Sequence, residues 1–315
     1  MANILITGVA GFIGSHTADH LLRAGHRVWG IDDLRTGRMS NIADARAAGL
    51  AFGKFSVLDA ARLEQLVKKA RVDAIIHLAA LVSVNESISE PELNFRLNVE
   101  ATHVVAEAAR RGGVKRLVFA SSAAVYGDTK KIPVAEDAAL NPISPYGSAK
   151  LASEYLLLAY AASHGITVRV QRYFNVFGRR QDPSSPYSGV ISIFVRRMRE
   201  GKAITIYGDG KQTRDFIAVD DVARANVLAA TKPGVESGVA NICTGRPVSL
   251  LALIKHLSRI APLKPLRFAP ARKGDIRRSA GTTAAARKSL GFRPQTDVSE
   301  SLTELAKEQS AGERE

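Results

Sequence analysis

Tyr146 and Lys150 lie four residues apart, a spacing that places two side chains on one face of a helix. A free tyrosine has a pKa of about 10, too high for a base at neutral pH. A cation one helical turn away favours the phenolate and lowers that pKa. Ser122, which follows the apolar run Arg116–Ala120, can bridge a substrate hydroxyl and the phenol. These residues predict proton transfer at a hydroxyl, although a tyrosine and a lysine at this spacing also occur often by chance.

A glycine-rich turn near the N-terminus makes the interpretation more specific. Gly8, Gly11 and Gly14 follow an expected strand, Asn3–Thr7, and run into an expected helix, Ile13–Ala24. Glycines at this spacing let the backbone approach a pyrophosphate, which free N–H groups at the helix N-terminus then bind. The position between a strand and a helix distinguishes such a loop from a pair of tight turns.

The next expected strand, Arg27–Ile31, ends in Asp32 and Asp33, about 20 residues further on. A carboxylate there can accept both hydroxyls of an adenosine ribose and repels a 2′-phosphate. The sequence therefore favours NAD over NADP as the cofactor. Asp59 can hold the adenine amine or cap the expected helix Ala60–Ala70, and the sequence leaves both roles open.

Short apolar runs alternate with amphipathic segments up to residue 175, which predicts an α/β fold with a Rossmann-type doubly wound parallel sheet. Ligands then bind at the carboxyl ends of the strands. We expect an NAD-binding domain over 1–175, to which 215–231 returns, and a smaller C-terminal α/β substrate-binding lobe, mainly 176–315. The other expected strands are 74–78, 116–120 and 167–173, and the other expected helices are 98–111 and 146–164.

The composition limits the classes of partner. The chain has 315 residues with 44 Lys+Arg against 30 Asp+Glu, a formal charge of +14 that attracts polyanions and phosphorylated small molecules. The densest basic run lies between Lys264 and Arg293. A single cysteine, Cys243, excludes an internal disulfide and a cysteine-rich metal site. With neither a membrane-length apolar stretch nor a secretory signal, we expect a cytoplasmic protein without metal, membrane or specific nucleic-acid partners.

Further motifs follow in order along the chain. The set comprises Gly8–Gly14, Asp32–Gly37, His77–Ala80, Ser121–Gly127, Ser144–Lys150, Arg172–Gly178, Gly208–Phe216 and Lys273–Ser279. Together they resemble the extended short-chain dehydrogenase/reductase family of NAD-dependent epimerases and dehydratases. Within it, the chain is similar to the nucleotide-sugar 4-epimerases of the UDP-glucose 4-epimerase type, over nearly its whole length.

The resemblance implies roles that spacing alone does not assign. Tyr146 takes the proton of the sugar 4-hydroxyl as hydride leaves carbon 4 for NAD, Ser122 assists, and Lys150 binds the nicotinamide ribose. The 4-keto sugar then turns over and receives the hydride on its other face. Cofactor contacts are implied for Phe12, Ile13, Asp32, Asp33, Asp59, Leu78, Ala79, Asn98 and Tyr173, and UDP contacts for Asn175, Arg214, Arg272 and Asp275. Two of these, Arg214 and Arg272, can neutralise a diphosphate.

The resemblance also bears on the sugar. A bulky tyrosine at the position of Ser279 is associated with restriction to UDP-glucose and UDP-galactose, whereas a small residue leaves room for an N-acetyl group. We therefore expect N-acetylated UDP-hexoses to be accepted as well, with Ser83 and Ser121 adding hydroxyls near the sugar. A uronate substrate stays an alternative in which Arg179 or Arg180 faces the carboxylate.

Other activities on the same fold are less consistent with the sequence. Dehydratases of the family carry an Asp-Glu pair, and decarboxylases a Glu, just after the catalytic serine or threonine, where this chain has Ala123 and Ala124. A reductase that consumes NADPH is disfavoured by Asp32. A nucleotide-sensing or nucleic-acid-binding protein is suggested only by the charge, and such a protein would be expected to lose the tyrosine or the lysine.

The two helices expected at 98–111 and 146–164 are apolar around most of their circumference. One face of each covers the sheet, and the remainder needs another partner. Family members pair these helices into an intersubunit four-helix bundle, so we expect a homodimer. Burial under loops of the same chain is the alternative.

Overall fold

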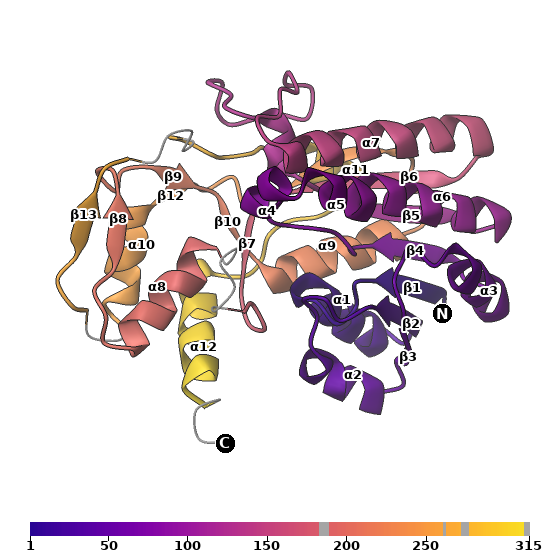
Figure 1. The fold of residues 1–315 in the computed structure, drawn as a ribbon, viewed down its shortest axis with the longest axis horizontal. Helices are drawn as coiled ribbons and strands as arrows, with labels where there is room; N and C mark the ends of the chain where they lie inside the picture. The colour runs from indigo at the N-terminus through magenta and orange to yellow at the C-terminus, as the bar shows by residue number, and fades with distance from the viewer. Residues whose placement is uncertain (183–188, 261–262, 272–276, 312–315) are drawn as a thin grey trace.

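The computed structural model describes residues 1–182, 189–260, 263–271 and 277–311. These residues form a sheet of seven parallel strands in the order β11-β6-β5-β4-β1-β2-β3 (Figure 1). The order from β3 to β6 is that of a dinucleotide-binding fold, with its reversal between β1 and β4. The expected Rossmann-type sheet is therefore confirmed. The strands are β1 (Asn3–Thr7), β2 (Arg27–Asp32), β3 (Ala51–Lys54), β4 (Ala74–His77), β5 (Arg116–Ser122), β6 (Thr167–Tyr173) and β11 (Gly238–Ile242).

Helices cover both faces of this sheet (Figure 1). One face carries α1, α9 and α11, with α9 packed against α1, and the other carries α3, α6 and α7. Alternate side chains of β1 point to opposite faces of the sheet. Ile4 and Ile6 belong to a first apolar core, under α1, α9 and α11, and Leu5 belongs to a second, under α3, α6 and α7. These helices are α1 (Phe12–Arg23), α3 (Ala60–Ala70), α6 (Ala101–Arg111), α7 (Pro145–His164), α9 (Val219–Thr231) and α11 (Ala284–Leu290).

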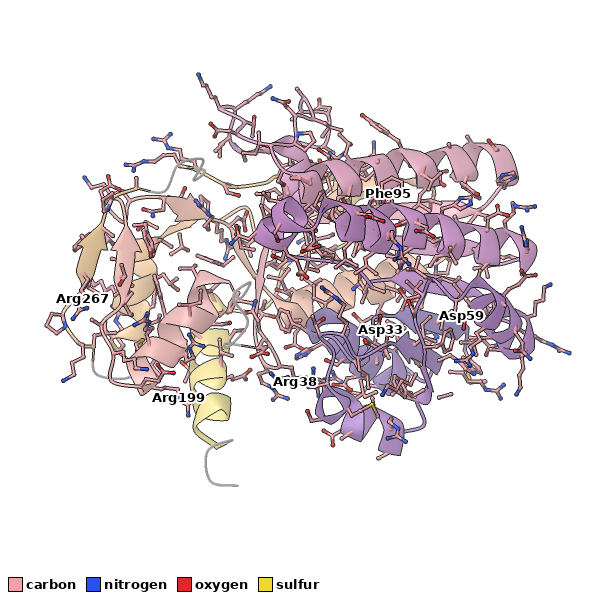
Figure 2. The ribbon with its side chains drawn as sticks, viewed as in Figure 1. Asp33, Arg38, Asp59, Phe95, Arg199 and Arg267 are labelled. Carbon is pink, nitrogen blue, oxygen red and sulfur yellow. The ribbon has the colours of Figure 1, made fainter. Side chains whose placement is uncertain are left out.

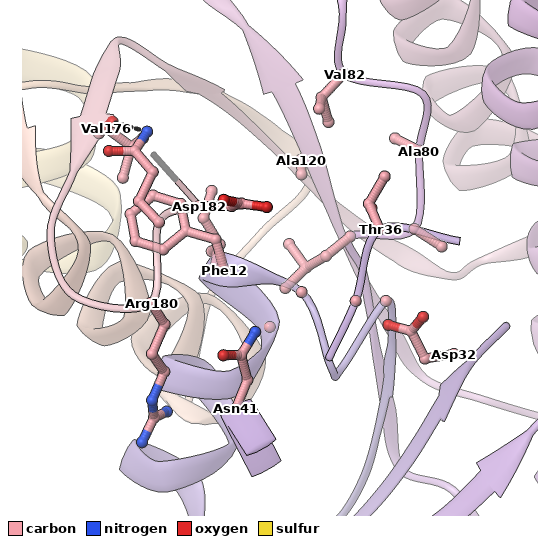
Figure 3. Close-up of a pocket in the computed structure, with 18 of the residues that line it drawn as sticks. Phe12, Asp32, Thr36, Asn41, Ala80, Val82, Ala120, Val176, Arg180 and Asp182 are labelled. Atoms are coloured by element: carbon pink, nitrogen blue, oxygen red, sulfur yellow. Dashed lines mark hydrogen bonds between the residues drawn. The ribbon is translucent and has the colours of Figure 1, made fainter. Parts of the chain in front are cut away.

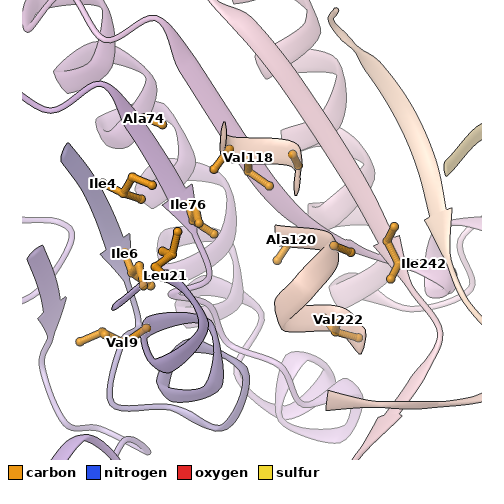
Figure 4. Close-up of a cluster of buried hydrophobic side chains, with 14 of the residues drawn as sticks. Ile4, Ile6, Val9, Leu21, Ala74, Ile76, Val118, Ala120, Val222 and Ile242 are labelled. Atoms are coloured by element: carbon orange, nitrogen blue, oxygen red, sulfur yellow. The ribbon is translucent and has the colours of Figure 1, made fainter. Parts of the chain in front are cut away.

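The first core continues across the sheet from β1 to its far edge. Figure 4 shows Ile6, Ile76 and Val118 lining up from neighbouring strands, with Leu21 of α1 and Val222 of α9 packed on them. All five side chains are fully buried. A core of this extent holds the strand ends rigidly, and the residues of the site extend from those ends.

A smaller lobe has its own apolar core, built around Phe194, Ile206 and Leu253. Three helices and three two-stranded pairings make up its described part. In Figure 1 it lies beyond the carboxyl ends of the central strands. Its elements are α8 (Val190–Arg199), α10 (Leu250–Leu257), α12 (Val298–Ala311), β8 (Thr205–Tyr207) with β13 (Arg267–Ala269), β7 (Asn175–Phe177) with β10 (Phe216–Ala218), and β9 (Thr213–Arg214) with β12 (Val248–Ser249).

Two strands of the main sheet were not expected from the sequence, and both are edge strands. β3 and β11 each have one neighbour and contain a glycine, Gly53 or Gly238. Short strands interrupted by glycine and by polar residues, such as Lys54 in β3 and Asn241 in β11, do not produce the continuous apolar run that marks a buried parallel strand. The helix expected from residue 98 also differs: α6 begins at Ala101, after a π-helical segment, Arg96–Glu100. Shorter helical segments are α2 (Ala43–Ala47), α4 (Val84–Ser89), α5 (Pro91–Phe95) and the 3-10 turns Met39–Ile42 and Ala123–Tyr126.

Across the described ranges, no helix is both long and apolar enough to cross a membrane. In the same residues, histidines, cysteines and carboxylates do not gather in groups of three that would hold a metal ion.

Candidate active site

A cleft of about 1320 Å³ opens at the carboxyl ends of the central strands. Residues at or just beyond five strand ends line it: Gly8, Asp32, Leu78, Ser122 and Tyr173. Its volume exceeds the roughly 300–1,000 Å³ typical of pockets for drug-sized ligands. The cleft is therefore large enough for a dinucleotide together with part of a second ligand.

The glycine loop between β1 and α1 forms one wall of the cleft (Figure 3). Gly8 has a φ of +72°, and a Cβ there would lie 2.7 Å from the Ala79 nitrogen. A Cβ on Gly14 would lie 2.1 Å from the Gly8 carbonyl oxygen, whereas on Gly11 it would meet only that oxygen, at 3.2 Å. Gly14 therefore packs directly against the Gly8 carbonyl, and Gly8 packs against the backbone of the loop after β4. The third caps α1, whose free N–H groups suit a pyrophosphate.

Asp32 lies at the end of β2, where a ribose is expected, and is 9% exposed. Its Oδ2 accepts the Ala10 N–H at 3.0 Å, and its Oδ1 accepts the Leu34 N–H at 2.8 Å. Each oxygen keeps a lone pair for a hydroxyl donor. Burial raises the pKa of this carboxyl, and the backbone donors oppose that rise. The residues of the loop and of Asp32 therefore fit NAD.

The other expected cofactor contacts fall into two groups. Phe12, Ile13, Asp33, Leu78 and Ala79 line the cleft, as does Tyr173. Asp59 and Asn98 do not line it, and both have other partners. Asp59 is labelled in Figure 2.

Asp59 is the N-cap of α3, where it accepts the Arg62 N–H at 3.2 Å. Of the two roles left open for it, capping is the one in the structure. Asn98 lies in the π-helical segment and donates its side-chain N–H to the Leu81 carbonyl at 3.0 Å and to Asn94 at 2.8 Å. It thereby supports the loop after β4 from below the cleft.

Ser122, Tyr146 and Lys150 all line the cleft. Ser144 caps α7 by accepting the Gly147 N–H at 3.1 Å, and Pro145 occupies the first turn. The cap fixes where the helix starts, so Tyr146 and Lys150 reach the cleft from successive turns. The Lys150 Nζ lies 5.9 Å from the centroid of the Tyr146 ring.

Burial dominates the titration of both α7 side chains. It lowers the pKa of Lys150 to about 7, and the negative charge of Glu154 opposes this shift. It raises the pKa of Tyr146, and the hydrogen bond with Ser122 opposes that rise. The sequence predicted a lowered pKa for Tyr146. The protein's own groups do not produce this lowering, because desolvation of the phenolate outweighs the stabilisation that they provide. The expected lowering depends on an oxidised nicotinamide as well as on Lys150, and it stays a prediction.

The expected substrate residues are only partly brought together. Asn175 lines the cleft, and its side-chain N–H donates to the Asp215 carbonyl at 3.1 Å. Arg214 and Ser279 do not line it but adjoin each other through Thr213. The Thr213 carbonyl accepts an Arg214 side-chain N–H at 2.9 Å and the Ser279 backbone N–H at 3.1 Å. The second of these bonds ties the segment after residue 276 to β9.

The remaining expected substrate residues differ in their surroundings. Ser121 lines the cleft, but its hydroxyl donates to Glu154 of α7. Ser83 is buried and caps α4, where its Oγ accepts the Glu86 N–H at 2.9 Å, and it does not line the cleft. Arg272 and Asp275 lie outside the described residues.

Sequence reasoning assigned no role to several residues that line the cleft. Most follow β2 or β3, where a parallel sheet exposes its loops to a ligand, so the strand ends were the available signal. Three of them take part in ion pairs: Arg35 pairs with Glu86, and Arg38 pairs with Asp182. The set is Arg35, Thr36, Arg38, Asn41, Asp44, Phe55, Val57, Gln181 and Asp182.

His77 is a further residue whose role the sequence did not reveal. Its Nδ1 lies 2.7 Å from the Thr7 hydroxyl, which also accepts the N–H groups of Leu78 and Ala79, each at 3.2 Å. Burial lowers the pKa of His77 to about 3, so the ring is neutral at physiological pH. The pair holds the loop after β4 against the glycine loop.

A dinucleotide loop that shares one cleft with a serine, a tyrosine and a lysine defines a short-chain dehydrogenase/reductase type of enzyme. The chain belongs to the NAD dependent epimerase/dehydratase family, whose sequence pattern matches residues 4–243. NAD is the cofactor of this family, as expected from the sequence. The resemblance seen in the sequence is confirmed.

Individual relatives cover the chain almost completely. A UDP-glucose 4-epimerase from Mycolicibacterium smegmatis is 39% identical over 302 residues, 95% of this chain and 95% of that protein. The crystal structure of UDP-glucose 4-epimerase from Thermotoga maritima with UDP-glucose has a TM-score of 0.93 at 37% identity, over 98% of this chain and 99% of that one. UDP-N-acetylglucosamine 4-epimerase from Methanobrevibacter ruminantium, in complex with UDP-N-acetylmuramic acid, has a TM-score of 0.93 at 35% identity, over 99% of each chain.

Proposed function

We propose that this protein is an NAD-dependent isomerase that interconverts the 4-epimers of UDP-hexoses. The relatives named above support this activity and include an enzyme named for an N-acetylated sugar. The observation that carries the proposal is the chemistry available beside Ser122. Its neighbours Ala123 and Ala124 form a 3-10 turn and have no acidic group.

The carboxylates that line the cleft lie away from Ser122 in the sequence and do not follow it directly. Among the described lining residues they are Asp32, Asp33, Asp44 and Asp182. The first three lie on β2 or the segment that follows it, and Asp182 pairs with Arg38 of that segment. None of them is positioned beside the α7 residues to remove a proton from a neighbouring carbon, as a dehydratase requires.

In the proposed mechanism, Tyr146 removes the proton of the sugar 4-hydroxyl and returns it to the 4-oxygen after the sugar has turned over. Ser122 donates a hydrogen bond to that oxygen and holds it beside the phenol. Lys150 places a positive charge near the ring, which favours the phenolate. The hydrogen bond with Ser122 opposes the desolvation that disfavours it. When bound, NAD supplies a hydride acceptor that is restored within each cycle.

The direct test is incubation with a panel of UDP-sugars, with the products separated by anion-exchange chromatography. We expect UDP-glucose and UDP-galactose to interconvert, and their N-acetylated forms as well. If no pair of 4-epimers on the panel interconverts, the proposal is wrong.

We also propose that the two parts of the chain bind different ligands, as the sequence suggested. Residues 1–175, with 215–231, hold the cofactor, and mainly residues 176–315 hold the UDP-sugar. The positions of the glycine loop and of Asp32 support the first assignment. A cytoplasmic location is proposed as well, supported by the single cysteine, Cys243, which is buried and free.

Tightly bound NAD is expected in the protein as purified. Because the hydride returns to the substrate in every cycle, turnover does not require the cofactor to leave. The protein can be denatured and the released nucleotide assayed in the supernatant. Predominance of NADP would contradict the role of Asp32, whose carboxylate repels a 2′-phosphate.

A homodimer is expected through the helices at 98–111 and 146–164, which are α6 with the segment before it and α7 in the structure. Exposed apolar side chains lie on α7 and on α4 and α5, which pack against it. Ile88 of α4, Phe95 of α5 and Tyr155 of α7 are between 57% and 62% exposed. Phe95 is labelled in Figure 2. Large apolar side chains on neighbouring helices are typical of a surface that binds another protein. Light scattering at micromolar concentration should give the mass of two chains, and the mass of a single chain would refute the dimer.

Replacement of Ser279 with tyrosine is expected to reduce turnover of the N-acetylated pair relative to the plain pair. Ser279 is half-buried beside β9. The family resemblance places this position at the wall of the sugar site, where a larger side chain would restrict a sugar that must turn with its bulkiest substituent. Kinetics on both pairs checks this, with Ser279→Ala as the control that keeps the side chain small. An unchanged ratio in Ser279→Tyr would remove Ser279 as the determinant.

The uronate alternative gains no support from Arg180. Its side chain pairs with Asp19 of α1 at 2.8 Å and is 13% exposed. A guanidinium already bound to one carboxylate is poorly suited to recognise another on the substrate.

A further inference from the structure

A third side chain follows the two catalytic candidates along α7. Glu154 lies four residues after Lys150, as Lys150 does after Tyr146, so the three occupy successive turns of one helical face. Tyr146 and Lys150 line the cleft, whereas Glu154 does not and is only 1% exposed. A carboxylate is thus buried directly behind the lysine.

The Glu154 carboxylate is bound on both oxygens. Arg172 donates from Nε at 3.0 and 3.2 Å and from Nη2 at 2.7 Å, and the Ser121 hydroxyl donates to Oε1. The remaining Arg172 donor, Nη1, reaches the Tyr126 hydroxyl at 2.9 Å and the Glu136 carbonyl at 3.1 Å. Both charged groups are therefore fully hydrogen-bonded away from water.

The strand register links this pair to the cleft. Ser121 of β5 lies opposite Arg172 of β6, and the next residues, Ser122 and Tyr173, lie opposite each other. Those next residues line the cleft. Glu154 consequently joins the helix that carries Tyr146 and Lys150 to the strand ends that carry the rest of the site.

Stability alone is a weak explanation for such a pair. Buried ion pairs can often be replaced by packed apolar side chains without loss of stability, because desolvation offsets their attraction. We propose that Glu154 is a positioning residue. It keeps Lys150 charged and fixes the position of the lysine side chain relative to Ser122. This inference rests on the proposed function, in which Ser122 binds the sugar 4-oxygen and Lys150 favours the Tyr146 phenolate that acts on it.

The electrostatics of the site agree with this geometry. Burial lowers the pKa of Lys150 to about 7, and Glu154 is the group that opposes the shift. The other titratable side chains around Lys150 and Glu154 are Tyr146, the neutral His77, Tyr126 and the cationic Arg172. Arg172 is the only cation in this set besides the lysine; it is paired with Glu154, and its like charge does not favour a charged Lys150.

The test is Glu154→Gln, which keeps the size of the side chain and removes its charge. The NAD-bound enzyme is labelled with ¹³C at the lysine Cε, and the Lys150 resonance is assigned by its loss in Lys150→Met. We expect the titration midpoint of Lys150 to fall by about one pH unit. We also expect kcat to fall about 10- to 100-fold with KM unchanged, and the alkaline limb of the pH profile to move to lower pH.

Two further variants keep the test decisive. Glu64→Gln removes an ion-paired carboxylate on α3, a helix that packs on α6 rather than on α7. This variant should leave both the Lys150 midpoint and kcat unchanged. If Glu154→Gln does not fold, Glu154→Leu/Arg172→Leu removes both charges together. Both decreases are then expected to be smaller, because the loss of the Arg172 cation partly opposes the loss of the carboxylate. A folded variant of either kind with an unchanged Lys150 midpoint and an unchanged kcat overturns the inference. If the unaltered protein has no epimerase activity, the proposed function fails, and the Lys150 midpoint still decides whether Glu154 sets the charge of that lysine.

Discussion

Tyr146→Phe is expected to lower turnover by about 10²- to 10⁴-fold, the contribution typical of a general acid–base group. The substitution removes one hydroxyl and leaves the ring, so the packing beside Lys150 should survive. Ser122 keeps its place at the end of β5, but its hydroxyl is a far weaker acid than a phenol and does not replace Tyr146. NAD content should stay close to that of the unaltered protein.

The measurement is kcat on UDP-glucose, together with the NAD released on denaturation. Tyr155→Phe is the matched control, because Tyr155 lies on the same helix, is 59% exposed and does not line the cleft. Turnover of Tyr146→Phe within a few-fold of the unaltered protein would reject Tyr146 as the base. Loss of NAD in that variant would instead mean that the ring itself supports the cofactor site.

Gly14→Ala is expected to remove most of the bound NAD. The new Cβ would lie 2.1 Å from the Gly8 carbonyl oxygen and 2.9 Å from the Val9 Cα. Both neighbours are backbone atoms and cannot rotate aside, so the loop and the start of α1 must separate. If this overpacking costs the bound conformation about 3 kcal/mol, NAD affinity falls about 100-fold.

The control for this prediction is Gly11→Ala. Gly11 has a φ of −75°, which alanine adopts readily, and its Cβ would meet only the Gly8 oxygen, at 3.2 Å. Thermal unfolding of the two variants without NAD should show a much larger loss of stability for Gly14→Ala. Equal NAD content and equal unfolding temperatures for Gly14→Ala and the unaltered protein would contradict the close packing of this loop.

Local signals in the sequence were sufficient for the parts of the site that lie on one element. The glycine loop needs only its own spacing and the strand before it, and Tyr146 and Lys150 need only the period of a helix. The central strands were predictable because burial on both faces gives continuous apolar runs. The sequence alone therefore determined the class of fold, the cofactor loop and the tyrosine–lysine pair.

Only the tertiary structure decided the features that depend on contacts between elements. It showed that Asp59 caps α3, and that the edge strands β3 and β11 complete the sheet. It also brought Glu154 onto Arg172 and Ser121, whose pairing follows from the packing of α7 on the sheet. The direction of the Tyr146 pKa was likewise beyond the sequence, because desolvation is set by how completely the rest of the chain encloses a side chain.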